Sequence, residues 1–442
     1  MKDHSLVRTL EALGLADGAT LARTLDVSEN TVSRLARENS KQIVKLGGSK
    51  NTRYALREPI LGLSDIQQLY WVDTEGKAIP FAMLNHLHGG RTHLSASGWS
   101  EAFHPNQVPW PLAGAVQVGY LGRAIAQGFV APPFSFDSIP ERWTFTQHLF
   151  VALNPNIDLP GAILIGEAAV ESWKKSSLAP NVSSDEYDAL THPNNRLREA
   201  GTSAGGEQPK FSALRDDKHL LVKLSPPRGT PSGETWHDLL HCEAIAARVL
   251  ESHGILAAKN RIVETSTRTY LESERIDRVG RYGRRHALPL FAIHARFVGG
   301  AQQRWPRTAA ALVAQRRLSK EDAHTIAIVF RFGELIGNND MHFGNLSLIA
   351  DTPEHLRKGR FRLAPIYDML PMRYRPETAA RDFPFSPFTP SAALHGEEQI
   401  DQQARSMAKR FWQEVSEANL QLDLRELANM MQRRVPSPIH LD

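Results

Sequence analysis

The chain has 442 residues, of which 41% are hydrophobic and 23% are charged, and a chain of this length suggests about three domains. These proportions exclude a wholly disordered or fibrous chain. The single cysteine, Cys242, excludes an intramolecular disulfide and is typical of a reducing compartment, so we expect a cytoplasmic protein without a membrane partner.

The net charge of +4 is concentrated at the start of the chain. Residues 1–57 contain ten Lys or Arg and six Asp or Glu, an excess of four that equals the charge of the whole protein. Residues 58–442 therefore sum to zero. A basic segment on a neutral body suggests that the segment binds a polyanion.

The order of helices in residues 1–57 is typical of a helix-turn-helix. Apolar residues at helical spacing stop at Gly14, and a second short helix is expected over residues 19–25. Ser28 is placed to cap a third helix that ends at Glu38. In a helix-turn-helix this last helix enters the major groove of DNA.

A β-hairpin is predicted next, with strands at residues 43–46 and 52–56 around a turn that contains Gly47 and Gly48. We therefore predict a winged helix-turn-helix domain over residues 1–57 that binds DNA. The side chains expected to contact DNA are Thr31, Ser33, Arg34, Arg37, Lys45, Lys50 and Arg53. The alternative is a three-helix docking module that never meets DNA.

Residues 60–150 are rich in Gly, Pro and alternating apolar residues, which predicts a small, mainly β subdomain. Short strands are expected at residues 70–72, 78–84 and 115–119. His86, His88 and His93 lie close together in sequence. No cysteine or suitably spaced acid accompanies them, so we expect surface histidines on a Gly-rich loop and no zinc site.

A Gly-rich segment, residues 201–211, precedes a strand that carries a lysine. Consecutive glycines let backbone N–H groups turn toward an anion, and Lys210 adds a positive charge. Lys223, inside the apolar strand 219–224, needs an anionic partner. Kinases use such a lysine to hold phosphates and pair it with a helix glutamate. Glu243, on a predicted helix over 236–250, is either that glutamate or a solvated flank residue.

The segment 336–348 contains Asp340 and Asn345 at the D-x-x-x-x-N spacing of the kinase catalytic loop. In that loop the Asp accepts the proton of the attacking hydroxyl and the Asn binds magnesium. About twenty residues later, Asp368 ends an apolar strand over residues 361–368 at the place of the metal-binding Asp of DFG, although the sequence here is Tyr-Asp-Met. Asn345 and Asp368 would supply the two oxygen ligands that Mg²⁺ needs beside phosphates.

With these motifs the chain resembles the HipA family of bacterial serine/threonine kinase toxins. The matching segments are SAGGEQPKF (203–211), VKL (222–224), ERID (274–277), NNDMHFGN (338–345) and IYD (366–368). The resemblance implies a two-lobed, kinase-like α/β body that uses ATP and Mg²⁺. We expect its N-lobe over residues 151–280, its mainly helical C-lobe over 281–442, and the winged domain in front of it.

The resemblance also implies roles for single residues. Asp340 would be the catalytic base, Asn345 and Asp368 the metal ligands, and Glu243 the ion-pair partner of Lys223. Ser203 matches the serine that members of the family autophosphorylate. The residues expected to contact ATP are Gly205, Gly206, Glu207, Gln208, Pro209, Lys210, Lys223, Glu274, Arg275, Ile276, His342, Asn345, Tyr367 and Asp368.

Characterised members of the family phosphorylate aminoacyl-tRNA synthetases, so the resemblance implies a protein substrate of this kind, together with DNA and an antitoxin as partners. A helix-turn-helix fused to the kinase departs from the family, whose members commonly rely on a separate DNA-binding antitoxin. Two other functions stay open: a DNA-binding regulator with a degenerate kinase-like body, and a metal-dependent nuclease, for which no motif is present.

Residues 261–317 contain twelve arginines, no lysine and four acids. Arginine prefers bidentate carboxylate and phosphate partners, so an acidic protein or a nucleic acid could dock here. The alternative is that these arginines pair with acids elsewhere in the body.

Overall fold

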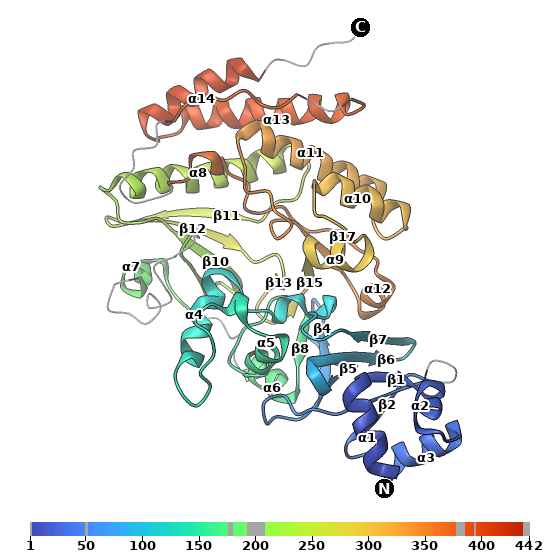
Figure 1. Cartoon of the computed structure of the whole chain (residues 1–442). Coiled ribbons are helices and arrows are strands. Elements are labelled where there is room, and N and C mark those ends of the chain that lie inside the picture. Colours follow the sequence, from blue (N-terminus) through green and yellow to red (C-terminus); the bar gives the residue numbers. More distant parts are fainter. Residues whose placement is uncertain are drawn as a thin grey trace. The chain divides into compact units, whose positions relative to one another are not determined.

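The computed structural model describes residues 2–48, 52–175, 180–191, 208–376, 385–392 and 395–435. The chain divides into two compact units, each described by itself below (Figure 1). The first comprises Met1–Val118 and Ala126–Leu178, and the second Gly119–Ile125 and Ala179–Asp442. Within the described residues, every helix is too short or too polar to cross a membrane.

The first unit begins with three helices and a three-stranded antiparallel sheet of order β1-β3-β2. Its elements are α1 (Lys2–Leu13), β1 (Leu15–Asp17), α2 (Gly18–Leu25), α3 (Glu29–Glu38), β2 (Ile43–Leu46) and β3 (Arg53–Leu56). The expected cap is present, because Ser28 Oγ accepts a hydrogen bond from the Thr31 backbone N–H at 3.2 Å. Gly14, at φ 72°, follows the last residue of α1. The predicted helices and hairpin strands are therefore present.

The rest of the first unit is built on a five-stranded antiparallel sheet of order β7-β6-β5-β4-β8. Its elements, with α4 shared between the units, are β4 (Ile66–Val72), β5 (Ala78–Leu87), β6 (Arg91–Ala96), β7 (Trp99–Phe103), α4 (Gly119–Val130), α5 (Phe145–Ala152), β8 (Ile163–Ile165) and α6 (Glu167–Lys175). Leu87 of β5 packs with Val44, Leu46 and Ala55. This contact joins the sheet to the hairpin.

The strand predicted at residues 115–119 is wrong. Ala115 ends a 3₁₀ helix, Trp110–Ala115, in which Pro111 lies in the first turn, and Gly119 begins α4. Between them, the backbone N–H of Gln117 donates to Nδ1 of His148 at 3.1 Å. A side chain, and not a neighbouring strand, therefore satisfies this backbone group.

The expectation of surface histidines is also wrong for two of the three. His86 lies in β5 and His93 in β6, and both are buried. The ring of His86 bonds to the Glu58 carbonyl oxygen at 2.7 Å and to Thr146 Oγ1 at 2.9 Å. Pairing of β5 with β6 removes these rings from solvent, which the local Gly-rich sequence did not reveal.

The second unit contains a larger and a smaller sheet covered by helices, and a two-stranded sheet of β13 and β14. The larger is antiparallel with order β11-β12-β10-β9, and the smaller has order β15-β16-β17. The elements are α7 (Tyr187–Leu190), β9 (Lys210–Arg215), β10 (Lys218–Leu224), α8 (Pro231–Ser252), β11 (Asn260–Glu264), β12 (Thr269–Glu274), β13 (Arg278–Val279), β14 (Gly283–Arg284), β15 (His286–Pro289), α9 (Leu290–Phe297), α10 (Trp305–Ala314), α11 (Lys320–Ile336), β16 (Ser347–Ala350), α12 (Pro353–Lys358), β17 (Arg362–Leu363), α13 (Glu398–Glu417) and α14 (Leu422–Arg434).

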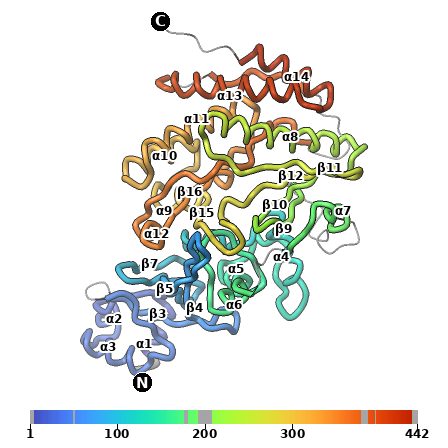
Figure 2. The backbone as a smooth tube through the Cα atoms, turned by 180° about the vertical axis from the view of Figure 1, so that it is seen from behind, coloured from blue at the N-terminus to red at the C-terminus, as the bar shows by residue number. Residues whose placement is uncertain are grey.

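Helix α8 lies between the larger sheet and α13 in both views of the chain (Figures 1 and 2). Its central position explains why most of its residues, from Trp236 to Leu250, are buried. The predicted strand over residues 361–368 is shorter than expected, since only β17 is assigned there and Ile366 forms an isolated parallel bridge with Ala257. The segment that leads to Asp368 is therefore also paired with Ala257, which lies shortly after the end of α8.

Candidate active site

Three buried or half-buried charges meet in the second unit, and we call Lys223, Glu243 and Asp368 the charge cluster. Lys223 is on β10 and Glu243 on α8, and their side chains are 5% and 2% exposed. The Lys223 Nζ donates to Glu243 Oε1 at 2.5 Å and Oε2 at 2.7 Å, and also to Asp368 Oδ1. One lysine therefore joins the sheet, the helix and the segment after β17.

The charges of this cluster stabilise one another. Burial by itself would lower the pKa of Lys223, but the carboxylates of Asp368 and Glu243 raise that pKa above its ordinary value. Burial would likewise raise the pKa of Asp368, yet Lys223 and Lys210 hold it below its usual range. Burial and the nearby Asp368 carboxylate raise the pKa of Glu243 above its ordinary value, although Lys223 acts in the opposite direction. Lys223 is therefore a cation shared between two acids.

Lys210 adds a second positive charge to the same face of the sheet. It is the cross-strand partner of Lys223 in the antiparallel pair β9–β10. Residues directly opposite each other on paired strands project from the same face. The two lysines therefore make this face attractive to an anionic ligand such as a phosphate.

The loop after α11 is tied to the charge cluster by Asn338. Helix α11 ends at Gly337, which has a φ of 80°. The Asn338 side chain accepts a hydrogen bond from the Asp340 backbone N–H at 3.1 Å and donates one to the Asp368 carbonyl oxygen at 3.3 Å. Asn345 Nδ2 donates to the Asp340 carbonyl oxygen at 2.8 Å. A continuous chain of contacts thus connects Lys223, Asp368, Asp340 and Asn345.

Asp368 has a backbone conformation that aspartate seldom adopts. Its φ is 55°, in the left-handed region, which costs about 1–3 kcal/mol and persists only where the surrounding structure imposes it. The preceding residue is anchored, since the Tyr367 hydroxyl donates to the Gly344 carbonyl oxygen at 2.9 Å and lies 2.7 Å from Ser347 Oγ. The strained position therefore directs the Asp368 carboxylate at Lys223, and Tyr367 supports the loop.

Two family models match this chain. Residues 202–437 match the HipA-like C-terminal domain, and residues 63–174 match the middle domain of YjjJ-like toxins. A curated relative, Toxin YjjJ of Escherichia coli (strain K12), is 33% identical over 412 residues, which cover 90% of this chain and 89% of that protein. The chain belongs to the HipA-like family.

The fold of a solved HipA agrees with this assignment. The structure of Shewanella oneidensis MR-1 HipA, in a complex with HipB and its operator DNA, has a TM-score of 0.50 and 14% sequence identity to this chain. The match covers 84% of this chain and 95% of that one. A mixed α/β body with the two-lobed, kinase-like HipA fold is therefore confirmed.

The other residues expected to contact ATP lie at several places in this HipA-like fold. Gln208, Pro209 and Lys210 are half-buried at the start of β9. The backbone N–H groups of Glu274 and Arg275 donate to the carbonyl oxygens of Lys259 and His219, each at 2.9 Å. Ile276 lies two residues after Glu274, the last residue of β12. His342 is exposed on the loop that contains Asp340. Ser203, Gly205, Gly206 and Glu207 lie outside the described residues.

Asn338 is the residue of this site that the sequence interpretation missed. It was part of the matched NNDMHFGN segment, yet no role was assigned to it. Its function as a bridge depends on Asp368, which is thirty residues later in the chain. The local signal in the sequence was a polar residue directly after the glycine that follows a helix.

At least five of the twelve arginines of residues 261–317 pair with acids. Arg261 lies 2.8 Å from Glu272, and Arg278 lies 2.6 Å from Asp277. Further pairs are Arg275 with Asp277, Arg281 with Asp217 and Arg304 with Glu334. These contacts favour internal pairing over a docking surface for an acidic partner.

The residues expected to contact DNA lie in the first unit. The exposed ones, on α3, β2 and β3, are Arg34, Arg37, Lys45 and Arg53. Arg34 pairs with Glu38 of the same helix at 3.0 Å. Thr31 and Ser33 are half-buried, and Lys50 lies outside the described residues.

Proposed function

We propose that this protein is a serine/threonine protein kinase of the toxin–antitoxin type that uses ATP and Mg²⁺. The observation that carries the proposal is the bond of Lys223 to both Glu243 and Asp368, with Asn338 tying Asp368 to the Asp340 loop. Kinases need a phosphate lysine, its helix glutamate, a metal-binding Asp and a catalytic Asp–Asn loop in one place.

The side chains fit a magnesium–nucleotide complex. Mg²⁺ takes oxygen ligands and is commonly held by one or two protein groups together with phosphates. Asn345 uses its amide nitrogen on the Asp340 carbonyl, so its oxygen is the atom that can serve as a ligand, beside the Asp368 carboxylate. The bound ion would neutralise charge on the phosphates.

The chain's own residues then have separate tasks. Lys223 would transfer its contact from Asp368 to a phosphate oxygen while Glu243 keeps it oriented, and Lys210 would add to the attraction. Asp340 would orient the hydroxyl of the substrate and accept its proton. Asn338 would fix the distance between Asp340 and Asp368, and Ser203, ahead of β9, would be the autophosphorylated residue.

We infer the partners from the relatives and from the first unit. The E. coli relative is named a toxin, and the Shewanella HipA structure contains HipB and operator DNA. For this chain we propose a protein hydroxyl as the substrate, with an aminoacyl-tRNA synthetase as the candidate, and an antitoxin as a partner. The helices α1–α3 with the β2–β3 hairpin would act as a winged helix-turn-helix on DNA, through exposed Arg34, Arg37, Lys45 and Arg53.

Phosphotransfer is tested with purified protein, labelled ATP, Mg²⁺ and a cell extract depleted of endogenous kinases. The substitution Asp340→Asn should reduce transfer by about 10²–10⁴-fold, because it removes a proton acceptor. Asp351→Asn is the matched control, since Asp351 is exposed and pairs with Arg362. Full transfer by the Asp340→Asn variant would contradict the kinase assignment.

A DNA-binding regulator with an inactive kinase-like body is the second candidate. The exposed basic side chains of the winged segment favour it, and the intact charge cluster does not exclude nucleotide binding without catalysis. Stabilisation by ATP and Mg²⁺ in a thermal shift, with no labelled product in any extract, would support this alternative.

A further inference from the structure

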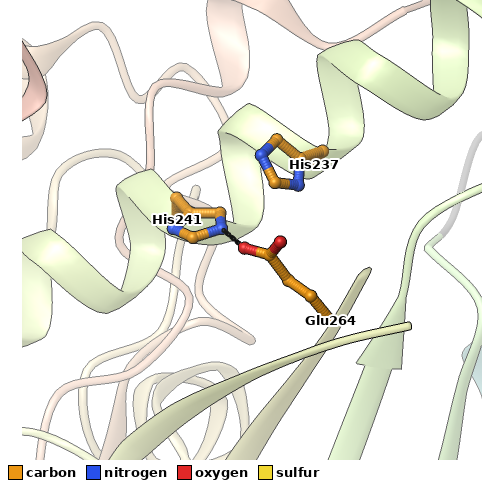
Figure 3. Close-up of side chains that lie close together, drawn as sticks. All are labelled: His237, His241 and Glu264. Carbon is orange, nitrogen blue, oxygen red and sulfur yellow. Dashed lines mark hydrogen bonds and ion pairs between the residues drawn. The ribbon is translucent and has the colours of Figure 1, made fainter. Parts of the chain in front are cut away.

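A second group of ligating side chains lies in the same unit, outside the charge cluster. His237 and His241 stand one turn apart on α8, and Glu264 is the last residue of β11. The three side chains point toward one another, and one ligand atom from each lies within 4.8 Å of the others (Figure 3). His241 Nε2 is already 3.0 Å from Glu264 Oε1. We call these residues the histidine cluster.

Local packing brings the two elements of this cluster together. Leu240 and Ala244 of α8 pack with Leu271 of β12 and Ile262 of β11, so this face of the helix lies on the sheet. His237 is three residues before Leu240, and His241 is three residues before Ala244 and four after His237, and residues three and four apart are neighbours on a helix. The contact of the histidines with Glu264 therefore follows from the helix–sheet interface and not from a chance surface encounter.

We propose that His237, His241 and Glu264 bind one divalent transition-metal ion, for which Zn²⁺ is the best candidate, with its remaining position open to water. Two imidazoles and one carboxylate are a donor set that zinc takes, and each ligand atom then lies about 2.0–2.2 Å from the metal. Ligand atoms on one tetrahedral ion are about 3.4 Å apart, given those bond lengths. The ligand atoms lie within 4.8 Å of one another in the structure, so the side chains would rotate to bring them to this separation.

Arg228 and Thr269 both contact His237: Arg228 opposes metal binding and Thr269 favours it. Arg228 Nη1 lies 2.5 Å from Nδ1 of His237, and Thr269 Oγ1 lies 2.7 Å from the same atom. If Nδ1 of His237 carries the proton and donates it to Thr269, Nε2 is able to bind the metal. If Arg228 donates to Nδ1, the proton lies on Nε2, which then cannot bind the metal. Arg228 also donates to Glu234 at 3.0 Å, so it keeps this acidic partner if its contact with His237 is lost when the metal binds.

The metal would join α8 to the edge strand β11 of the larger sheet. Helix α8 also carries Glu243, and the sheet carries Lys223. Binding would therefore stabilise the helix in the position that keeps the ion pair of the charge cluster formed. This consequence for phosphotransfer rests on the proposed kinase function, whereas metal binding itself does not.

The test uses full-length, tag-free protein that has been stripped of metal and holds no nucleotide. Titration with Co²⁺, read by its visible absorption, and then with Zn²⁺ by calorimetry should show one site per chain. His241→Ala and Glu264→Gln should each weaken Zn²⁺ binding by about 100-fold or more, above the effect of losing an outer-shell partner. Glu264 is exposed, so its isosteric substitution leaves the fold intact.

Two controls separate this site from the rest of the chain. His253→Ala, an exposed histidine just after α8, should bind Zn²⁺ as the wild type does. Asp368→Asn, which removes a proposed magnesium ligand, should also keep the zinc site, so that failure of the kinase assignment and failure of the zinc site are distinguishable. Absence of Zn²⁺ binding in the wild type, or unchanged affinity in His241→Ala and Glu264→Gln, would overturn the proposal.

Discussion

The charge cluster and the winged N-terminal segment use charged residues in opposite ways. In the cluster, Lys223 and Glu243 are almost wholly buried and are bonded to each other. In the segment, Arg34 and its partner Glu38 have side chains that are 62% and 48% exposed. Charges that leave water must be paired, whereas exposed pairs contribute little to stability and are easily exchanged for another partner.

This difference indicates what each region can do. A buried, paired lysine has one fixed position and can hold a ligand at a defined point next to Asp368. Exposed arginines and lysines with weak internal partners can move onto a phosphate backbone at small cost. The contrast predicts that substitutions in the cluster affect stability and chemistry together, and that substitutions in the segment affect binding alone.

The largest effect is expected from Lys223→Met. The substitution leaves two carboxylates near each other without their shared cation, and breaking a buried pair in this way costs about 3–5 kcal/mol. The cost should fall toward the lower end, because the Asp368 side chain is 28% exposed. Urea unfolding monitored by circular dichroism measures the change, and labelled phosphate transfer should be lost as well.

Two further variants show whether charge is the cause. Lys218→Met removes a lysine of the same strand that pairs with Glu274 at 2.6 Å in a largely exposed position, so it should cost less than about 1 kcal/mol. Adding Glu243→Gln to Lys223→Met should recover part of the lost stability. Equal losses for Lys218→Met and Lys223→Met would contradict the contrast between buried and exposed pairs.

Asn338→Ala should affect the chemistry next most strongly. It removes both hydrogen bonds that tie Asp340 to Asp368, and each is worth about 1 kcal/mol. We expect kcat to fall by roughly tenfold or more, since about 1.4 kcal/mol corresponds to a factor of ten, with a smaller change in KM for ATP. Asn339→Ala is the control, because Asn339 is the exposed neighbour. A loss shared equally by both variants would indicate a general effect on the loop.

Asp238 extends the comparison to a buried acid whose hydrogen bonds, among the described residues, come from Gln421 and not from a cation. It is fully buried on α8, contacts Gln421, and burial raises its pKa to about 7 from an ordinary 3.8. The folded chain therefore binds more protons than the unfolded chain between these values, and stability should fall as pH rises from about 4 to 7. Asp238→Asn should raise Tm at pH 8 and leave it nearly unchanged at pH 4, whereas Asp423→Asn, at an exposed position, should do neither. A Tm gain that is the same at both pH values would exclude ionisation as its cause.

The parts of the site that sequence could predict are those set by local spacing. Asp340 and Asn345 are five residues apart, and Lys223 stands inside an apolar strand, so both signals are visible without tertiary structure. The predicted helix around Glu243 and the strand around Lys223 are confirmed as α8 and β10. These elements have long apolar patterns that tertiary contacts do not override.

What sequence could not predict depends on contacts between distant segments. The bridge of Asn338 to Asp368 and the approach of Glu264 to His241 join residues 30 and 23 positions apart. His86 and His93 are buried because two strands pair, although the surrounding glycines are typical of a loop. Residues 115–119 are not a strand, and the backbone N–H of Gln117 donates to His148, which is 31 residues later in the chain.

The smallest effect is expected from single substitutions in the winged segment. Arg34→Ala and Lys45→Ala should each weaken DNA binding a few-fold and reduce the salt slope by about one, as the loss of one phosphate contact does. Fluorescence anisotropy at several salt concentrations measures both quantities, and Arg8→Ala, exposed on α1, is the matched control. Phosphotransfer and the unfolding free energy should stay at the wild-type level in all three variants. If Arg34→Ala and Lys45→Ala bind DNA with an unchanged salt slope, these side chains do not contact phosphate and the segment is a docking module.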